Sequence, residues 1–246
     1  MSKKRALLYR RYYSPRRPGE VAETRSFIPP TPEKSFRDVV RYLIGRKYIH
    51  VTQNGYCHLL PKGVFIHEAL VAYADQQLEQ AGALRYRFSS FFSTDRTDAV
   101  WPLISRFEKQ MYKMVGSEEV YLKYASDPVL FEYLAGRQIE TPLKIYSPDY
   151  FFRAIQTGEL RPLINPREFY MTDYHFFCEP HDFGVFVDAA LMNKRTVEAL
   201  AGSWYLNVDT NAEFFEARRS VIVELLDRLG VNAVVNVTGT PDVPPG

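Results

Sequence analysis

The chain has 246 residues, of which 46% are hydrophobic and 15% aromatic, and its formal net charge is +2. This much apolar surface excludes an intrinsically disordered chain, and the length predicts either one large domain or one domain with small additions. The near-neutral charge excludes a polybasic nucleic-acid binder over the chain as a whole.

The sequence lacks an apolar run of roughly 18 residues, so no membrane span is expected, and no apolar stretch follows the basic N-terminus as in a secretory signal. Its two cysteines, Cys57 and Cys178, provide neither a disulfide framework nor a CxxC metal motif. We therefore expect a soluble, cytoplasmic protein with reduced thiols.

Residues 1–34 are rich in proline and arginine and predict an irregular, basic arm. The first 17 residues contain no acid, and their basic residues are Lys3, Lys4, Arg5, Arg10, Arg11, Arg16 and Arg17. Such an arm suits contact with phosphate backbones, and it equally suits a solvated, frayed terminus.

Apolar residues at helical spacing predict a helix over 36–45 and a long helix over 61–81 that ends at Gly82. Between them, 48–51 and 55–60 are expected as short extended segments joined by a turn. Further strands are predicted over 84–92, 120–124, 142–146, 150–154, 167–178 and 231–237. Further helices are predicted over 97–114, 128–137, 188–202 and 211–229.

Strands with helices between and after them predict an α+β fold, a mainly antiparallel sheet flanked by helices, rather than a doubly wound sheet. This core is expected over residues 35–238, and residues 239–246, with three prolines and no periodicity, are expected to form a flexible tail.

Four short segments in the middle of the sequence carry a family resemblance. They are Gly116–Tyr121, Pro142–Lys144, Phe152-Arg153 and Arg167–Asp173. In this order and spacing they resemble the catalytic domains of prolyl- and threonyl-tRNA synthetases, which are class II aminoacyl-tRNA synthetases of subclass IIa. The family has a Thr-Ser-Glu type loop, then a Leu-Pro-Leu strand, and then motif 2, an Arg-containing strand followed by a loop and a returning Arg-Glu-Phe strand. Upstream, Gly55–Gly63 and the helix after it resemble motif 1.

The resemblance implies an incomplete synthetase core that binds ATP with Mg²⁺, an amino acid and the acceptor end of tRNA. Arg153 would then stabilise the charge that builds on the α-phosphate, Phe169 would stack on adenine, and Glu118 would hold the substrate ammonium. The residues expected to face ATP or the acceptor end are Glu159, Arg161 and Arg167.

Each residue also has an ordinary structural interpretation. Arg153 suits a surface ion pair, Phe169 suits a core, and Glu118 suits a solvated turn. The strand–loop–strand pattern predicts that Arg153 and Phe169 lie side by side on an antiparallel sheet that also contains residues 120–124.

The sequence departs from the family at several positions. Ile155 stands where motif 2 has a Glu that reads the adenine amino group, and Gly116 stands where a Thr is usual. Phe88-Ser89-Ser90 lacks the Pro that closes motif 1. No counterpart of motif 3, with its second phosphate-binding Arg, precedes the last residue, which predicts a core truncated before motif 3.

Threonyl enzymes also bind zinc through a Cys and two His. His175 matches one of these His, and Asp127 falls near the position of the Cys. Because no residue matches the third ligand, zinc is not expected, and His175 suits either a metal ligand or a strand histidine with a hydrogen-bond partner.

Two functions therefore stay open. The first is a threonyl- or prolyl-type aminoacyl-tRNA ligase core, impaired alone and completed by a second polypeptide. The second is a non-catalytic synthetase-like module that holds tRNA or a protein partner. In either case the resemblance to motif 1 predicts a homodimer through residues 63–81 and the strand after them.

Overall fold

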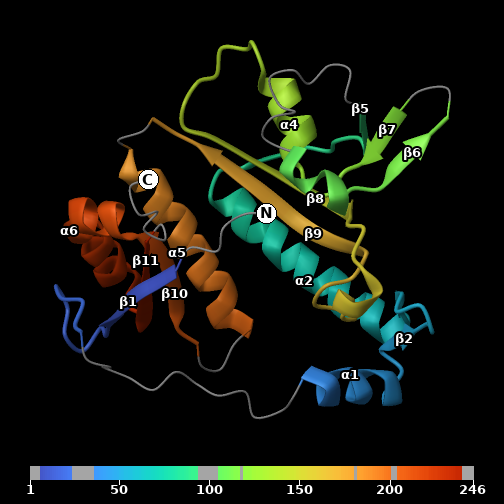
Figure 1. Ribbon diagram of the computed structural model, residues 1–246, viewed down its shortest axis with the longest axis horizontal. Helices are drawn as coiled ribbons and strands as arrows, with labels where there is room; N and C mark the ends of the chain where they lie inside the picture. The colour runs from blue at the N-terminus through green and yellow to red at the C-terminus, as the bar shows by residue number, and fades with distance from the viewer. Residues whose placement is uncertain are drawn as a thin grey trace, which may run out of the picture. The chain divides into compact units, whose positions relative to one another are not determined.

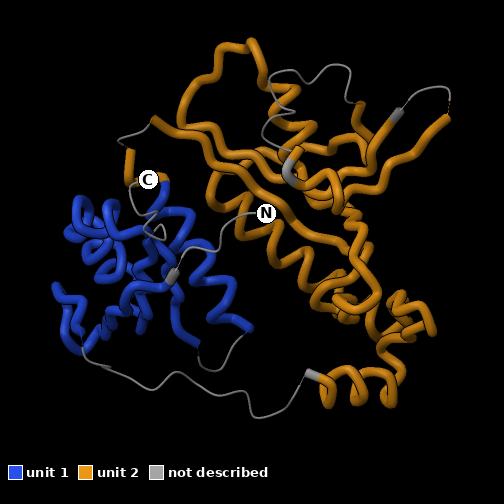
Figure 2. The backbone as a smooth tube through the Cα atoms, viewed as in Figure 1, with its two compact units in different colours: residues 1–33, 186–246 blue, residues 34–185 orange. Residues whose placement is uncertain are grey.

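The computed structural model describes residues 6–23, 36–93, 105–116, 119–179, 182–200 and 204–239. These residues form two compact units, shown in Figures 1 and 2: unit 1 consists of residues 1–33 and 186–246, and unit 2 of residues 34–185. The single core predicted over 35–238 is therefore divided, because its C-terminal part folds with the N-terminal arm.

Unit 1 is a three-stranded sheet packed against a helix. The strands lie in the order β1-β11-β10, with β1 antiparallel and β10 parallel to the central β11. The strands are β1 (Ala6–Tyr13), β10 (Leu206–Asn211) and β11 (Ala233–Gly239), and the helices of this part of the chain are α5 (Phe183–Leu200) and α6 (Ala212–Leu229). The core joins Phe215 and Leu226 of α6 to Val235 and Val237 of β11, all fully buried.

The prediction of an irregular arm is wrong for residues 6–13, which form β1. Successive side chains of a strand point to opposite faces, which explains how a segment with several basic residues can contribute apolar side chains to a core. Tyr9 and Tyr13 face α6, where their hydroxyls donate to Glu216 and Asp227, and Arg10 between them reaches Asn236 instead. The tail prediction falls on residues 239–246, of which Gly239 ends β11 and the others lie outside the described residues.

Unit 2 is built on a long hairpin of two ten-residue strands, β8 (Leu143–Phe152) and β9 (Glu168–Phe177). The two strands predicted at 142–146 and 150–154 are one continuous strand. The short β4 (Leu84–Arg85) pairs with β8 in parallel.

Helix α2 (Pro61–Gln80) packs on one face of this sheet (Figure 1). The Tyr146 hydroxyl donates to Glu79, and the His67 ring meets Tyr170 edge to face at 5.1 Å. Burial and the bond to Glu79 raise the pKa of Tyr146 to about 12.

A second small sheet has the order β5-β7-β6, and all its pairings are antiparallel. Its strands are β5 (Phe91–Ser93), β6 (Lys113–Val115) and β7 (Glu119–Leu122). The prediction that residues 120–124 join the sheet of β8 and β9 is therefore wrong. The helix predicted over 97–114 is also wrong where the structure describes it, since 105–110 form a 3-10 helix, η1 (Ser105–Gln110), and 113–115 form a strand.

The remaining elements agree closely with the sequence predictions. They are α1 (Phe36–Gly45), β2 (Ile49–Val51), β3 (Cys57–Leu59) and α4 (Asp127–Leu134). The loop after β8 also contains one 3-10 turn, η2 (Thr157–Glu159), which the sequence did not predict. Antiparallel and parallel pairings occur in both units, so the fold is mixed α/β rather than clearly mainly antiparallel. Of the helices that the structure describes, none combines the length and the apolar character needed to cross a membrane.

Candidate functional site

The candidate site lies on the face of the β8–β9 hairpin that α2 does not cover. Side chains alternate along each strand, so Tyr146 and Tyr170 face α2 while Phe151, Phe169 and Asp173 point the other way. We call this second surface, which α2 leaves uncovered, the open face; Phe151 on it is nevertheless fully buried, with Lys123 over its ring. Sequence-predicted and unpredicted residues meet on it.

Arg153 and Phe169 lie side by side, as predicted. The guanidinium carbon of Arg153 lies 4.9 Å from the centre of the Phe169 ring, and its Nε is 3.4 Å from the carbonyl oxygen of Tyr124. The Arg153 N–H donates to the Arg167 carbonyl at 2.8 Å, which continues the strand pairing beyond the end of β8. This backbone hydrogen bond therefore fixes the position of the Arg153 Cα, from which the side chain extends.

The loop residues expected beside ATP divide into two groups. Glu159 and Arg161 are exposed in the loop after β8. Arg167 donates from Nε to the Ile155 carbonyl at 3.0 Å, and its two terminal nitrogens lie 3.4 Å from Asn54 and Thr157 acceptors. Its side chain therefore contacts the loop after β8 and the β2–β3 turn. Glu118 lies outside the described residues.

An ion pair that the sequence did not predict lies beside Arg153 and Phe169. Lys123 is fully buried, and its Nζ lies 2.8 Å from the Asp149 carboxylate and 5.4 Å from the centre of the Phe151 ring. Ser147 donates to the same carboxylate at 2.6 Å. The sequence signal for this ion pair was Lys123 itself, which stands between Leu122 and Tyr124, because a buried lysine needs a partner of opposite charge.

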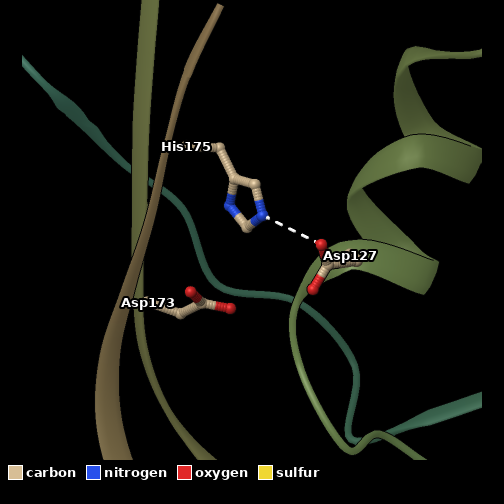
Figure 3. A group of neighbouring side chains, drawn as sticks. All are labelled: Asp127, Asp173 and His175. Carbon is tan, nitrogen blue, oxygen red and sulfur yellow. Dashed lines mark hydrogen bonds and ion pairs between the residues drawn. The ribbon is translucent and has the colours of Figure 1, made fainter. Parts of the chain in front are cut away.

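A third group on the open face joins Asp173 and His175 of β9 to Asp127 at the start of α4 (Figure 3). His175 Nε2 lies 3.4 Å from Asp127 Oδ1, and Asp173 accepts from the Ser126 N–H at 3.0 Å. Burial lowers the pKa of His175, but the bond to Asp127 and the charges of Asp173 and Asp127 outweigh it and raise the pKa above its ordinary value.

This group fits a divalent cation chemically. It offers two carboxylates and one imidazole, with one donor atom from each residue within 4.8 Å of the others. A tetrahedral ion with bonds of about 2.0–2.1 Å holds its ligand atoms about 3.4 Å apart, which matches the spacing of His175 and Asp127. The sequence placed Asp127 and His175 near family zinc ligands, and the structure adds Asp173 to them.

Comparison with known proteins gives a consistent family but modest identity. No protein-family model matches the chain. The threonine–tRNA ligase of Methanopyrus kandleri is 26% identical over 181 residues, which cover 71% of this chain and 29% of that protein. The human cytoplasmic threonine–tRNA ligase 1 is 25% identical over 175 residues, covering 68% and 24%.

Solved structures agree on the fold. The RNA-binding domain of threonyl-tRNA synthetase from Cryptosporidium parvum superposes with a TM-score of 0.65 at 20% identity, over 80% of this chain and 53% of that one. The prolyl-tRNA synthetase of the same organism, complexed with halofuginone and AMPPNP, gives 0.56 at 18% identity, over 64% and 34%.

The sequence and the fold therefore lead to the same group of proteins. The chain spans between 24% and 29% of the length of these two ligases. It is homologous to threonyl-tRNA synthetases and shares the fold of aminoacyl-tRNA synthetase domains.

Proposed function

We propose that this chain is an aminoacyl-tRNA synthetase-like protein of the threonyl or prolyl type that binds ATP, an amino acid and the acceptor end of tRNA. The observation that carries the proposal is Arg153 stacked on Phe169 on the open face, next to the buried Lys123–Asp149 pair. Homology to threonyl-tRNA synthetases supports the same assignment.

The chemistry follows from these groups. Forming an aminoacyl adenylate brings a carboxylate against the α-phosphate of ATP, and negative charge builds there as pyrophosphate leaves. A guanidinium whose backbone is fixed by strand pairing can stabilise that charge with little reorganisation. Phe169 offers a flat face to adenine, Glu118 would hold the amino-acid ammonium, and Mg²⁺ would accompany the triphosphate.

The Asp127–Asp173–His175 group would hold a cation beside this site. A bound divalent ion acts as a Lewis acid on an oxygen or nitrogen ligand of the substrate. Without an ion, the chain's own residues orient one another, because Asp127 fixes the His175 ring and Ser126 fixes the Asp173 carboxylate.

Two features predict weak nucleotide binding. Ile155 is 9% exposed and offers no acceptor to an adenine amino group. A missing hydrogen-bond partner at a buried polar site costs about 1–3 kcal/mol. Arg153 also lies against the Phe169 ring that adenine would use.

Calorimetry with Mg²⁺-ATP tests the proposal. We expect weak binding that Arg153→Ala weakens further. A matched control is Arg137→Ala, because Arg137 also lies over an aromatic ring, at 4.6 Å from the centre of Tyr133, outside the open face. Absence of ATP binding in the unmodified protein would contradict the nucleotide part of the proposal.

Pyrophosphate exchange with threonine and with proline tests the catalytic part. We expect little or no exchange from the chain alone, since Ile155 weakens base recognition. Strong exchange with either amino acid would show a working enzyme and would identify its substrate.

The second candidate is a non-catalytic synthetase-like module that holds tRNA or a protein partner. The buried Ile155 favours it, because it replaces the residue with which the family reads adenine. Binding of tRNA, measured by fluorescence anisotropy, together with no ATP binding, would select this alternative.

We also propose a homodimer through α2. Phe65 is 74% exposed, and Ile66 and Leu70 are exposed on the same helix, so their burial against a second copy would be favourable. Light scattering should give a dimer that Phe65→Asp converts to a monomer. Val115→Asp, at an 80% exposed apolar residue of β6, should leave the dimer intact. A monomer in the unmodified protein at micromolar concentration would contradict this.

A further inference from the structure

Unit 2 contains a cavity of about 610 Å³ whose lining includes Phe169 and Arg167 but not Arg153. It is lined by β3, the first half of α2, and the ends of β8 and β9 where they meet the loop between them. The volume lies within the range of small-molecule sites, about 300–1,000 Å³. The lining residues that carry the argument are Tyr56, His58, His67, Tyr150, Arg167 and Tyr170.

This cavity lies mainly on the opposite side of the sheet from Arg153. Tyr150 and Tyr170 are a cross-strand pair that faces α2, whereas Phe151 and Phe169 form the next pair and face the open side. Phe169 contributes to the cavity lining, and Arg153 does not. A ligand here would therefore be separate from one stacked on the open face of Phe169.

Aromatic rings form a preassembled wall in the cavity. Tyr170 meets Tyr150 edge to face at 5.1 Å and meets His67 in the same way at 5.1 Å. Tyr150 is half exposed and Tyr56 is 44% exposed, so each presents ring surface to a ligand. Rings arranged in this way favour a planar aromatic guest, such as a nucleobase, which stacks on any of the exposed faces.

A positive charge is held at one end of the same cavity. The Arg167 guanidinium lies 5.7 Å from the Tyr56 ring centre, and it makes three hydrogen bonds to the loop and the β2–β3 turn. A guanidinium has five N–H donors, so two are left for a ligand. Held rigidly in this way, Arg167 suits a phosphate oxygen. Glu168 also lines the cavity and can accept from an amino group of a base.

The walls are fixed before a ligand arrives. Gly55 has a positive φ of 79°, and a Cβ at this position would collide with the Leu160 side chain. The turn of the β2–β3 hairpin therefore packs closely on the loop between β8 and β9, and the Arg167–Asn54 bond ties the two together. A preformed cavity of this kind loses little conformational entropy on binding.

We propose that this cavity binds a nucleotide, with its base against Tyr56, Tyr150 and Tyr170 and its phosphate at Arg167. The nucleotide is either a free nucleoside monophosphate or an unpaired nucleotide of an RNA strand.

Binding is measured by calorimetry on the full chain carrying Arg153→Ala, which removes the other proposed nucleotide contact. The probes are the four ribonucleoside monophosphates and a single-stranded RNA oligonucleotide. Binding is expected, and Tyr150→Ala or Tyr56→Ala should weaken it about tenfold, as loss of one stacking partner does. The matched control is Tyr42→Ala, an exposed tyrosine of α1 that also lies beneath an arginine, Arg46, and it should leave binding unchanged.

The arms of the experiment separate the outcomes. Equal binding of monophosphates and RNA identifies a free-nucleotide site, and binding of RNA alone identifies an RNA site. No binding of either probe overturns the proposal. Binding that is insensitive to Tyr150→Ala and Tyr56→Ala also overturns it, even with ATP binding to the unmodified protein intact. Failure of the ATP proposal would leave this result unaffected, because the test is made without Arg153.

Discussion

The central strand of unit 1 and the outer strand of the unit 2 hairpin show two ways to use a β-strand. In β11, Ala233, Val235 and Val237 are completely buried against α6. In β9 no residue is fully buried, although the strand is rich in aromatic residues and also carries Asp173 and His175. The first strand stabilises its unit by apolar burial, and the second keeps polar groups within reach of a ligand.

The polar side chains of unit 2 need partners. Polar groups on a half-covered sheet stay in place only when they pair, as Lys123 does with Asp149 and His175 with Asp127. Stability in unit 1 should therefore depend on side-chain volume, and stability in unit 2 on charge pairing.

The largest effect is expected in the unit 1 core. Phe215→Ala removes a fully buried ring and should lower the free energy of unfolding by about 4 kcal/mol. Phe214→Ala is the matched control, because the Phe214 ring is 53% exposed, and this substitution should change stability little. Chemical denaturation measures both variants, and equal losses would contradict the core described here.

In unit 2 the corresponding test removes a charge. Lys123→Met leaves the Asp149 carboxylate without its cation and should cost about 3 kcal/mol. Replacing both residues, with Lys123→Met and Asp149→Leu together, should cost less than Lys123→Met alone. Denaturation of Lys123→Met, of Asp149→Leu and of the double variant completes the cycle. If the losses of the two single variants add up to that of the double variant, the ion pair does not stabilise this sheet.

A pH titration tests the buried tyrosine of unit 1. Burial and the hydrogen bond to Asp227 raise the pKa of Tyr13 to about 12. The folded state thus holds this proton more tightly than the unfolded state does. The stabilisation is fully present below pH 10 and is lost as the pH rises through 12, a loss of about 2–3 kcal/mol. Tyr13→Phe should flatten this part of the stability profile, measured by denaturation between pH 9 and pH 12. An unchanged slope would refute the assignment.

The smallest effect concerns the cap of α6. Asn211 accepts from the Phe214 N–H at 2.7 Å and satisfies one of the free donors of the first turn. Asn211→Ala should cost about 1 kcal/mol, and Asn211→Ser should recover most of it. Thermal unfolding followed by circular dichroism measures both, and a neutral Asn211→Ala would show that β10 already fixes the start of the helix.

Sequence patterns correctly predicted the elements whose own residues define their secondary structure. Apolar periodicity and Gly82 placed α2, and the aromatic run of β9 with its preceding loop placed the hairpin. The pattern failed where a long-range partner decides. Leu206–Asn211 is too polar to predict a strand, and it becomes β10 only because β11 lies beside it.

The same distinction holds for the site. Ordered motifs brought Arg153 and Phe169 together correctly, since both lie on one hairpin. The Lys123–Asp149 pair joins two segments whose approach depends on how β7 leads into β8, and no local spacing encodes it. Asp173 was not assigned a role because Ser126, which donates to it, and Asp127 come from a different part of the chain.

The stacking of Arg153 on Phe169 has a consequence for rates. The guanidinium lies on the ring face that an incoming base would need, so base stacking requires the arginine to leave first. Opening then precedes binding, and the observed association rate should rise with nucleotide concentration only up to the rate at which Arg153 swings away. Arg153→Lys, with a smaller and non-planar head group, would release the ring more readily and raise that plateau.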